Sequence, residues 1–132
     1  MKEFAAVEWD RARRALESAR KLVETDPDSA ASRAYYGAFH ALTALFGLRG
    51  QMFTKHSSLR AALHRHLVQP GLLGREAGKD YDFLMDLRET GDYGGIAQVP
   101  ADSARRAVEK ANAFLAAVAS ACPEFKGLHS GD

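Results

Sequence analysis

Residues 29–48 read SAASRAYYGAFHALTALFGL, and this stretch decides the fold because it is apolar around most of a helical circumference. Two neighbouring stripes recur at helical spacing, namely Ala31, Tyr35, Ala38, Leu42 and Leu45, and Tyr36, Phe39, Thr43 and Phe46. A helix of this kind packs on several sides, so we expect it to be the central helix of a bundle. Arg33 and His40 are its polar exceptions.

The segment before it carries a narrower apolar seam, typical of a helix with one buried face. Its members alternate at spacings of four and three: Ala5, Trp9, Ala12, Leu16, Ala19 and Val23. Pro27 breaks this pattern, and Asp28 or Ser29 can cap the central helix that follows.

Three further helical segments follow the central one. We expect a short helix at about 55–68, capped by Thr54 or Ser57, and long helices at about 75–89 and 101–121. The fourth segment places Arg88 on the same seam as Ala77, Tyr81 and Leu84. Residues 91–100 predict an irregular loop, which is long for a helical bundle.

No strand pattern is present, so the sequence predicts an all-α fold, an antiparallel up-and-down bundle of four long helices and one short helix. The 132 residues suit one domain. We expect that domain to span 1–122, followed by a flexible tail at 123–132.

Composition narrows the classes of function. Eighteen Lys and Arg against seventeen Asp and Glu give a net charge of +1, which excludes a uniformly basic nucleic-acid binder. The lone cysteine, Cys122, excludes an internal disulfide and suits a reducing compartment. The sequence has no secretory signal and no apolar run of about 20 residues, so we expect a cytoplasmic protein with no membrane association.

The small net charge hides a strong partition along the chain. Residues 29–75 contain no Asp or Glu but six Lys and Arg, and they hold four of the five histidines. Residues 76–92 then carry six acids against Lys79 and Arg88. A basic region of this kind attracts phosphate backbones or other anionic partners. The alternative is that the basic third helix pairs with acids of the fourth helix or of a partner.

Arg88 is the leading candidate for chemistry, because an arginine on an apolar seam needs a partner such as Asp92. If the helix end frays into the following loop, Arg88, Asp92 and Tyr93 converge on one cleft. Arginine can stabilise charge on a phosphate while a phenol or imidazole moves the proton. The alternative is that the Arg88–Asp92 ion pair only holds the following loop in place.

Four more residues are candidates for nucleotide or RNA binding. Arg33 and His40 lie two turns apart on one face of the central helix, although a buried histidine is more often a hydrogen-bonded core residue. Lys55 and His56 lie at a predicted helix start, where free amides favour anions but ordinary capping is also expected. No metal-ligand spacing or phosphate-binding glycine loop is present, so no metal and no cofactor are expected.

Four ordered motifs resemble the prokaryotic HEPN domain family. Residues 32–41, SRAYYGAFHA, are similar to the family's S-R-A-Y-Y-A-x-F-H-A helix, and Lys55-His56-Ser57 resembles its K/S-H-S/G element. Residues 87–94, LRETGDYG, resemble its L-R-x-x-A-D-Y-G segment, and the alanines and Phe114-Leu115 of the last helix fit its closing A-x-x-x-A-x-x-F-L pattern. The resemblance runs from about residue 5 to 120.

The resemblance implies a helical bundle that dimerises, with a role in RNA cleavage or nucleotide binding as a toxin–antitoxin or defence component. It implies a metal-independent endoribonuclease in which Arg88 contacts phosphate, Asp92 orients Arg88 and Tyr93 is the reactive or modifiable hydroxyl. Nuclease members of the family have histidine where this chain has Tyr93. The alternative implied role is therefore a non-catalytic nucleotide-binding or interaction partner of a minimal nucleotidyltransferase.

Overall fold

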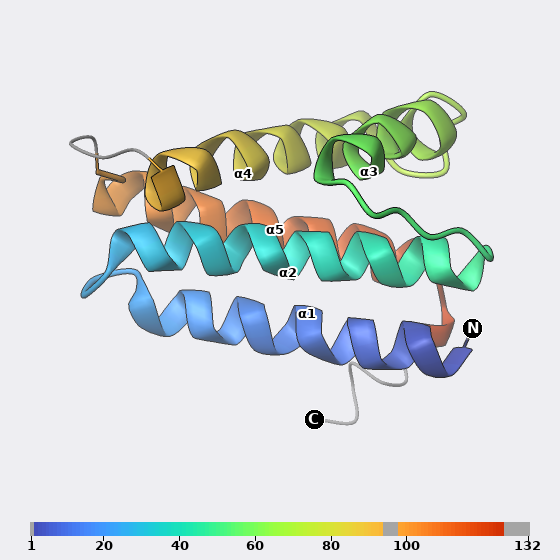
Figure 1. The fold of residues 1–132 in the computed structure, drawn as a ribbon, viewed down its shortest axis with the longest axis horizontal. Coiled ribbons are helices and arrows are strands. Elements are labelled where there is room, and N and C mark those ends of the chain that lie inside the picture. The colour runs from blue at the N-terminus through green and yellow to red at the C-terminus, as the bar shows by residue number, and fades with distance from the viewer. Residues whose placement is uncertain (1, 94–97, 126–132) are drawn as a thin grey trace.

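The computed structural model describes residues 2–93 and 98–125, which fold into an antiparallel helical bundle (Figure 1). The elements are α1 (Lys2–Leu22), α2 (Pro27–Leu48), α3 (His56–Ala62), the π-helix η1 (Leu63–Val68), α4 (Arg75–Tyr93) and α5 (Ala101–Ala121). No strand is present among the described residues. The predicted all-α bundle of four long helices and one short helix is confirmed.

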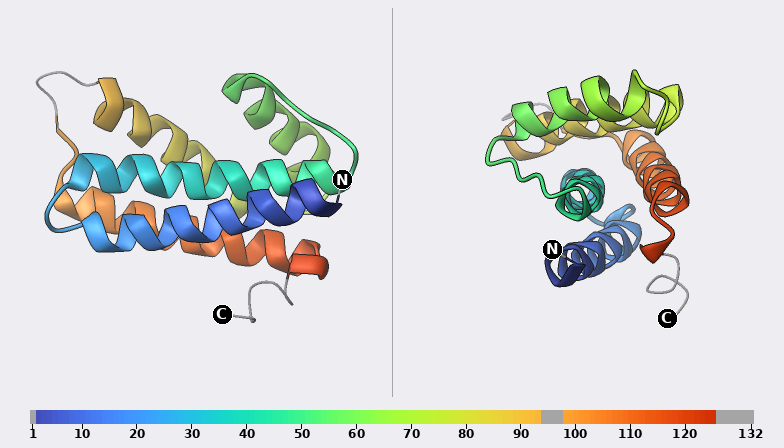
Figure 2. Two further views of the ribbon diagram at one scale, coloured as in Figure 1. Left: turned by 60° about the horizontal axis from the view of Figure 1, so that its bottom comes forward. Right: turned by 90° about the vertical axis from the view of Figure 1, so that its right-hand side faces the viewer.

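The helix α2 is central, as its two apolar stripes predict. It packs against α1, α4 and α5, which surround it in the end-on view of Figure 2. Its first stripe is fully buried, whereas Tyr36, Phe39 and Thr43 of the second are only half-buried. A Cβ on Gly37 would lie 3.4 Å from the backbone oxygen of Ala12, so α1 and α2 pack closely there.

The predicted seams of the outer helices are also buried. All six members of the α1 seam are buried, and so are Ala77, Tyr81 and Leu84 of α4. Arg88 lies on that same α4 seam and is only 8% exposed. The period of the apolar residues therefore places an arginine side chain among core residues, where its charge needs partners.

The cap of α2 differs from the prediction. Asp26, not Asp28 or Ser29, is the N-cap residue, and Pro27 takes the first helical position, where its missing N–H costs nothing. The Asp26 carboxylate accepts from the Ser29 amide at 3.2 Å and from the Ser29 hydroxyl at 2.6 Å. These two hydrogen bonds lower the pKa of Asp26. The predicted caps Thr54 and Ser57 are likewise wrong, because α3 begins after Lys55 with no side-chain cap.

The end of α4 is longer than predicted. The helix continues through Gly91 to Tyr93, whereas the sequence predicts that it ends near residue 89 and gives way to a loop. A Cβ on Gly91 would lie 2.8 Å from the backbone oxygen of Asp28, so only a glycine fits without a shift. The Asp28 carboxylate also accepts from the Val99 amide at 2.7 Å. The end of α4 thus packs against the start of α2, and Asp28 also joins that start to the segment before α5.

Packing continues beyond the predicted domain boundary at residue 122. Phe125 is 1% exposed, and its ring stacks on Trp9 with 4.7 Å between centroids. The remainder of the predicted tail, 126–132, lies outside the described residues. Across the described parts of the chain, every helix is too short or too polar to cross a membrane.

Candidate functional site

Four of the predicted site residues meet around one side chain that the sequence did not single out, Tyr36 of α2. The guanidinium carbons of Arg33 and Arg88 lie 5.8 and 5.9 Å from its ring centroid. The rings of His56 and His40 lie 6.0 and 6.3 Å away. We call Arg33, Tyr36, His40, His56 and Arg88 the Tyr36 cluster.

Arg88 is the most enclosed member of the Tyr36 cluster. Its Nη1 donates to the Tyr36 hydroxyl at 3.3 Å, and its Cζ lies 4.8 Å from the Tyr35 ring centroid. Nη1 also lies 3.7 Å from Oδ2 of Asp92, one turn further along α4. The predicted Arg88–Asp92 pairing is present, and it forms within a continuous helix rather than a frayed end. Its catalytic role stays a prediction.

His56 comes from the start of α3 and lies beside the aromatic residues of α2. Its Nδ1 is 2.5 Å from the Tyr35 hydroxyl, and its ring stacks on Phe39 at 4.7 Å. Burial, and secondly the charge of Arg88, lower the pKa of His56 below the ordinary 6.5. The imidazole is therefore neutral at pH 7 and has the form that a general base requires.

His40 joins the cluster from the next turn of α2 but is held by a buried acid. Its Nδ1 lies 2.6 Å from Oε2 of Glu8, a residue of α1 that is only 7% exposed. Arg11 contacts the other carboxylate oxygen of Glu8 at 3.4 Å. This geometry fits the alternative stated from the sequence, in which His40 is a hydrogen-bonded residue of the core.

One predicted site residue, Lys55, is not brought into this contact set. It is exposed and is the residue before α3, which begins without a side-chain cap. Tyr93 ends α4, but its side chain lies outside what the structure describes.

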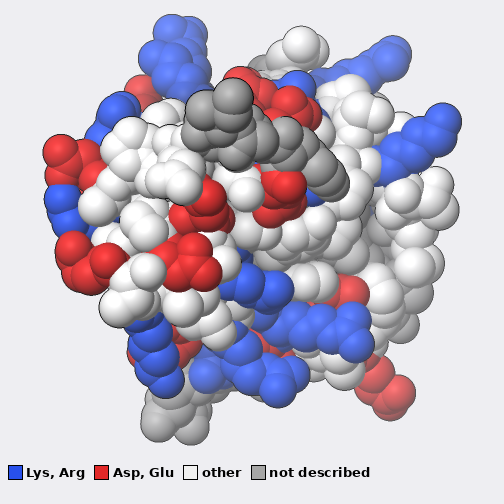
Figure 3. Space-filling view, turned by 60° about the vertical axis from the view of Figure 1, so that its left-hand side comes forward, with Lys and Arg blue, Asp and Glu red and all other residues white. Residues whose placement is uncertain are grey.

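The basic middle of the chain is in part paired with the acidic fourth helix. Arg60 lies 3.7 Å from Asp82 and 3.2 Å from Asp86, and His64 lies 3.0 Å from Asp82. On the face shown in Figure 3, Lys and Arg are likewise interspersed with Asp and Glu. Attraction for a phosphate would therefore depend on particular side chains rather than on a single-sign surface.

Sequence reasoning missed Tyr35, Tyr36 and Glu8. Glu8 carries a readable signal, because it follows Ala5 by three residues and precedes Ala12 by four, which places it on the buried seam of α1. The two tyrosines were assigned only to the apolar stripes of α2. A phenol has a polar end even on an apolar stripe, and here the hydroxyls of Tyr35 and Tyr36 find partners in His56 and Arg88.

The bundle and the Tyr36 cluster together define a small all-α protein whose polar site is formed by side chains of α2, α3 and α4. The HEPN domain family model matches residues 6–121, nearly the whole chain. The chain belongs to the HEPN domain family.

One relative supports this assignment, and one solved structure shares the fold. A UPF0332 protein of Thermotoga maritima is 34% identical over 117 residues, which cover 88% of this chain and 89% of that protein. The crystal structure of TT1696 from Thermus thermophilus matches with a TM-score of 0.74 and 21% identity. That match covers 89% of this chain and 97% of the Thermus chain, and it shows that the two share a fold.

Proposed function

We propose that the protein binds RNA or a nucleotide through the Tyr36 cluster and acts as a metal-independent, ribonuclease-type component of a toxin–antitoxin or defence system. One observation carries the proposal: two arginines and two imidazoles surround a half-buried tyrosine ring. Guanidinium groups bind phosphate, and aromatic rings stack on unpaired bases. Arg33 is exposed and would make the first contact with the phosphate.

Cleavage would use the neutral imidazole of His56. The 2′-hydroxyl of a ribose would give its proton to Nε2 of His56, whose Nδ1–H would donate to the Tyr35 hydroxyl oxygen. The ribose oxygen would attack the adjacent phosphorus while the bond from phosphorus to the 5′ oxygen breaks. Water would supply the proton that the leaving oxygen needs. Arg88, oriented by Asp92, would stabilise the charge that builds on the phosphate oxygens.

The test is to incubate the purified chain with total RNA in EDTA and to compare Arg88→Ala, His56→Gln and Arg33→Ala. We expect cleavage by the wild type, at least about a hundredfold less by the Arg88 and His56 variants, and weaker RNA binding by the Arg33 variant. Arg106→Ala is the matched control, because Arg106 lies 5.0 Å from the Phe83 ring, outside the Tyr36 cluster. Circular dichroism checks that each variant is folded.

Equal cleavage by the wild type and Arg88→Ala would remove the catalytic proposal, and so would intact RNA with both. Intact RNA that is still bound, with binding lost in Arg33→Ala, would leave a binding role for the Tyr36 cluster. The absence of both cleavage and binding would remove the RNA proposal altogether.

The second candidate is a non-catalytic partner of a minimal nucleotidyltransferase. The burial of Arg88 favours it, because a side chain that is 9% exposed is suited to holding α4 against α2. Tyr93 in place of histidine favours it as well. Co-purification with a nucleotidyltransferase encoded beside this chain, with RNA left intact, would decide for this function.

In either role we propose that the protein is a homodimer in the cytoplasm. The Tyr36 clusters of two copies could then serve one bound RNA or nucleotide. Sedimentation that shows a monomer at micromolar concentration would contradict the dimer.

A further inference from the structure

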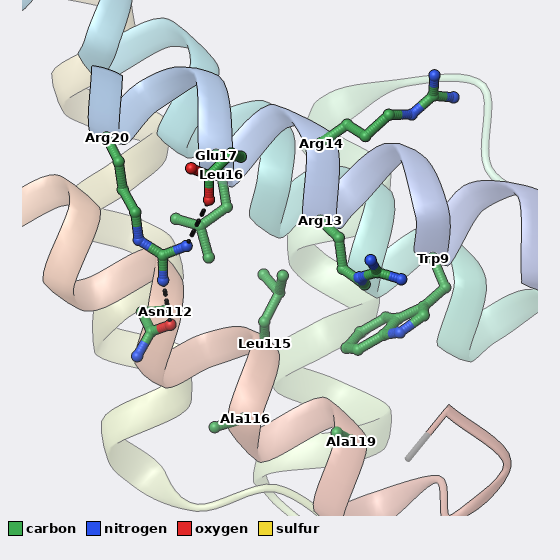
Figure 4. Close-up of a pocket in the computed structure, with 10 residues that line it drawn as sticks. All are labelled: Trp9, Arg13, Arg14, Leu16, Glu17, Arg20, Asn112, Leu115, Ala116 and Ala119. Carbon is green, nitrogen blue, oxygen red and sulfur yellow. Dashed lines mark hydrogen bonds and ion pairs between the residues drawn. The ribbon is translucent and has the colours of Figure 1, made fainter. Parts of the chain in front are cut away.

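The two sides of α1 that face the other helices differ in their polar contacts. On the side that faces α5 a groove of about 620 Å³ remains, and Nη2 of Arg20 donates to Oδ1 of Asn112 there at 2.8 Å (Figure 4). On the side that faces α2, Glu8 is buried and contacts the ring of His40. The groove is lined by no member of the Tyr36 cluster, whereas Glu8 contacts one of them.

The contact with Glu8 determines which nitrogen of His40 always carries a proton. Nδ1 of His40 lies 2.6 Å from Oε2 of Glu8. An ionised carboxylate can only accept hydrogen bonds, so Nδ1 carries a proton in both the neutral and the charged imidazole. Nε2 is therefore the nitrogen at which His40 gains and loses a proton.

The Nε2 side of the same ring is open. In the part of the chain that the structure describes, His40 is hydrogen-bonded to Glu8 through Nδ1, and Nε2 has no partner. The His40 side chain is 19% exposed, and Nε2 is not among the enclosed polar atoms that lack a partner. A water or a ligand can therefore reach Nε2, while Nδ1 is held at the buried carboxylate.

The two imidazoles of the Tyr36 cluster lie against the same aromatic side chains. The ring centroids of His40 and His56 are 5.3 and 4.7 Å from that of Phe39, and both rings also lie beside Tyr36. His40 meets Phe39 edge-on, whereas His56 is stacked on it. One small aromatic patch thus carries an imidazole from α2 and another from the start of α3.

We propose that Nε2 of His40 holds the water that protonates the leaving 5′ oxygen, and that Glu8 is the positioning residue for this imidazole. The proposal rests on the proposed function, in which His56 accepts the proton of the 2′-hydroxyl. In the charged form of His40, Nε2–H donates to the water oxygen. As the bond from phosphorus to the 5′ oxygen breaks, the water gives a proton to that oxygen and takes the proton of Nε2. His40 becomes neutral, the water is restored, and both imidazoles return to their starting forms by proton exchange with solvent.

The charged and titratable groups around His40 come from three other helices. Glu8 of α1 is in direct contact with the ring, and Arg11 of α1 contacts the other carboxylate oxygen of Glu8 at 3.4 Å. His56 of α3 and Arg88 of α4 lie beside Tyr36. The Glu8 carboxylate is therefore the group that balances a positive charge on His40, through a charge-assisted hydrogen bond at Nδ1.

The first test compares two dinucleotide substrates that differ only in the leaving atom, a 5′ oxygen or a 5′ sulfur. A thiolate is far less basic than an alkoxide and leaves without a proton, so the sulfur substrate does not need the water held by His40. His40→Gln should lower cleavage of the oxygen substrate at least about a hundredfold, and cleavage of the sulfur substrate by less than about threefold. His56→Gln should lower both, because the 2′-hydroxyl loses its base in either case. His66→Gln changes an exposed histidine of η1 and is the matched control, which should alter neither.

The second test locates the protons of His40 in the full chain without RNA. In nitrogen-15 NMR spectra recorded between pH 5 and 9, the large change should occur at Nε2 of His40, while Nδ1 keeps the signal of a protonated nitrogen. Glu8→Gln should keep this pattern, because its amide oxygen can still accept from Nδ1. Glu8→Met removes the acceptor, so Nδ1 should then change as well. Circular dichroism checks that both variants are folded.

The outcomes separate this proposal from the proposed function. If the wild type cleaves neither substrate, the ribonuclease function fails, and the role of His40 in cleavage fails with it. If the wild type cleaves both and His40→Gln loses the same factor on oxygen and on sulfur, the ribonuclease function stands and the role of His40 is overturned. A large change at Nδ1 in the wild type would overturn the positioning role of Glu8.

Discussion

The guanidinium of Arg88 lies over the ring of Tyr35, with 4.8 Å between Cζ and the ring centroid. Tyr35 is fully buried on α2, and Arg88 is 8% exposed on α4. A charge this enclosed is stabilised by the negative face of an aromatic ring and by hydrogen bonds. The same contact that joins two helices therefore also fixes where one of the two arginine charges of the Tyr36 cluster lies.

This contact predicts a measurable coupling between the two side chains. In a double-mutant cycle of Arg88→Met and Tyr35→Leu, we expect a coupling of about 1 kcal/mol in the free energy of unfolding. Urea denaturation of the four proteins measures it. Arg106→Met combined with Tyr35→Leu is the control pair and should be additive within about 0.5 kcal/mol. Additivity of the Arg88 pair would mean that the contact contributes nothing.

Protonation of His56 is expected to destabilise the fold. Its pKa in the folded chain is below 6.5, so as the pH falls through 6.5 the unfolded chain takes up the proton first. The free energy of unfolding then decreases, and above that pH the contribution of His56 is constant. Between pH 7.5 and 5.5, His56→Gln should lose less stability than the wild type. His66→Gln changes an exposed histidine of η1 and is the control; an equal loss in the two variants would refute the assignment.

The close approach of Gly91 to Asp28 predicts an asymmetric effect of two glycine substitutions. Gly91→Ala should lower the free energy of unfolding by about 1–3 kcal/mol, because its Cβ would meet the Asp28 carbonyl oxygen at 2.8 Å. At Gly74 a Cβ would meet no heavy atom within 4 Å, so Gly74→Ala should change stability by no more than about 1 kcal/mol. Thermal unfolding compares the two variants. Similar losses of stability would show that the close approach of Gly91 to Asp28 does not exclude a larger side chain.

The thiol of Cys122 should react slowly. Burial, and secondly the charge of Glu124, raise its pKa to about 11. The thiolate is the reactive form, so alkylation by iodoacetamide at pH 8 should be about a hundredfold slower in the folded chain than in urea. The folded rate should keep rising with pH between 8 and 10. A rate that levels off near pH 9 would contradict the raised pKa.

The positions of the helices could be predicted because each long helix has an apolar seam with a clear period. The start of α2 and the end of α4 could not. Asp26 and Asp28 are chemically equivalent candidates for a cap, and only the backbone path decides which carboxylate reaches the Ser29 amide. Gly91 usually weakens a helix, but here contact with α2 favours its continuation.

The sequence indicated single residues of the candidate site but not which of them lie together. The position of Arg88 on an apolar seam correctly indicated a partly buried charge with Asp92 as a partner. His56 and Arg88 meet beside Tyr36 because the connection after α2 brings the start of α3 back alongside α2. The spacing of residues along one helix does not show where the next helix packs. The Glu8–His40 contact joins two helices in the same way.

The stacking of Phe125 on Trp9 has a consequence for anyone who trims or fuses this chain. The family match ends at residue 121, four residues before a ring that is 1% exposed. A fragment cut at the family limit would remove the ring that stacks on the indole of Trp9, a side chain that is itself only 1% exposed. A shortened variant should therefore keep Phe125, and a tag or fusion partner is best attached beyond it.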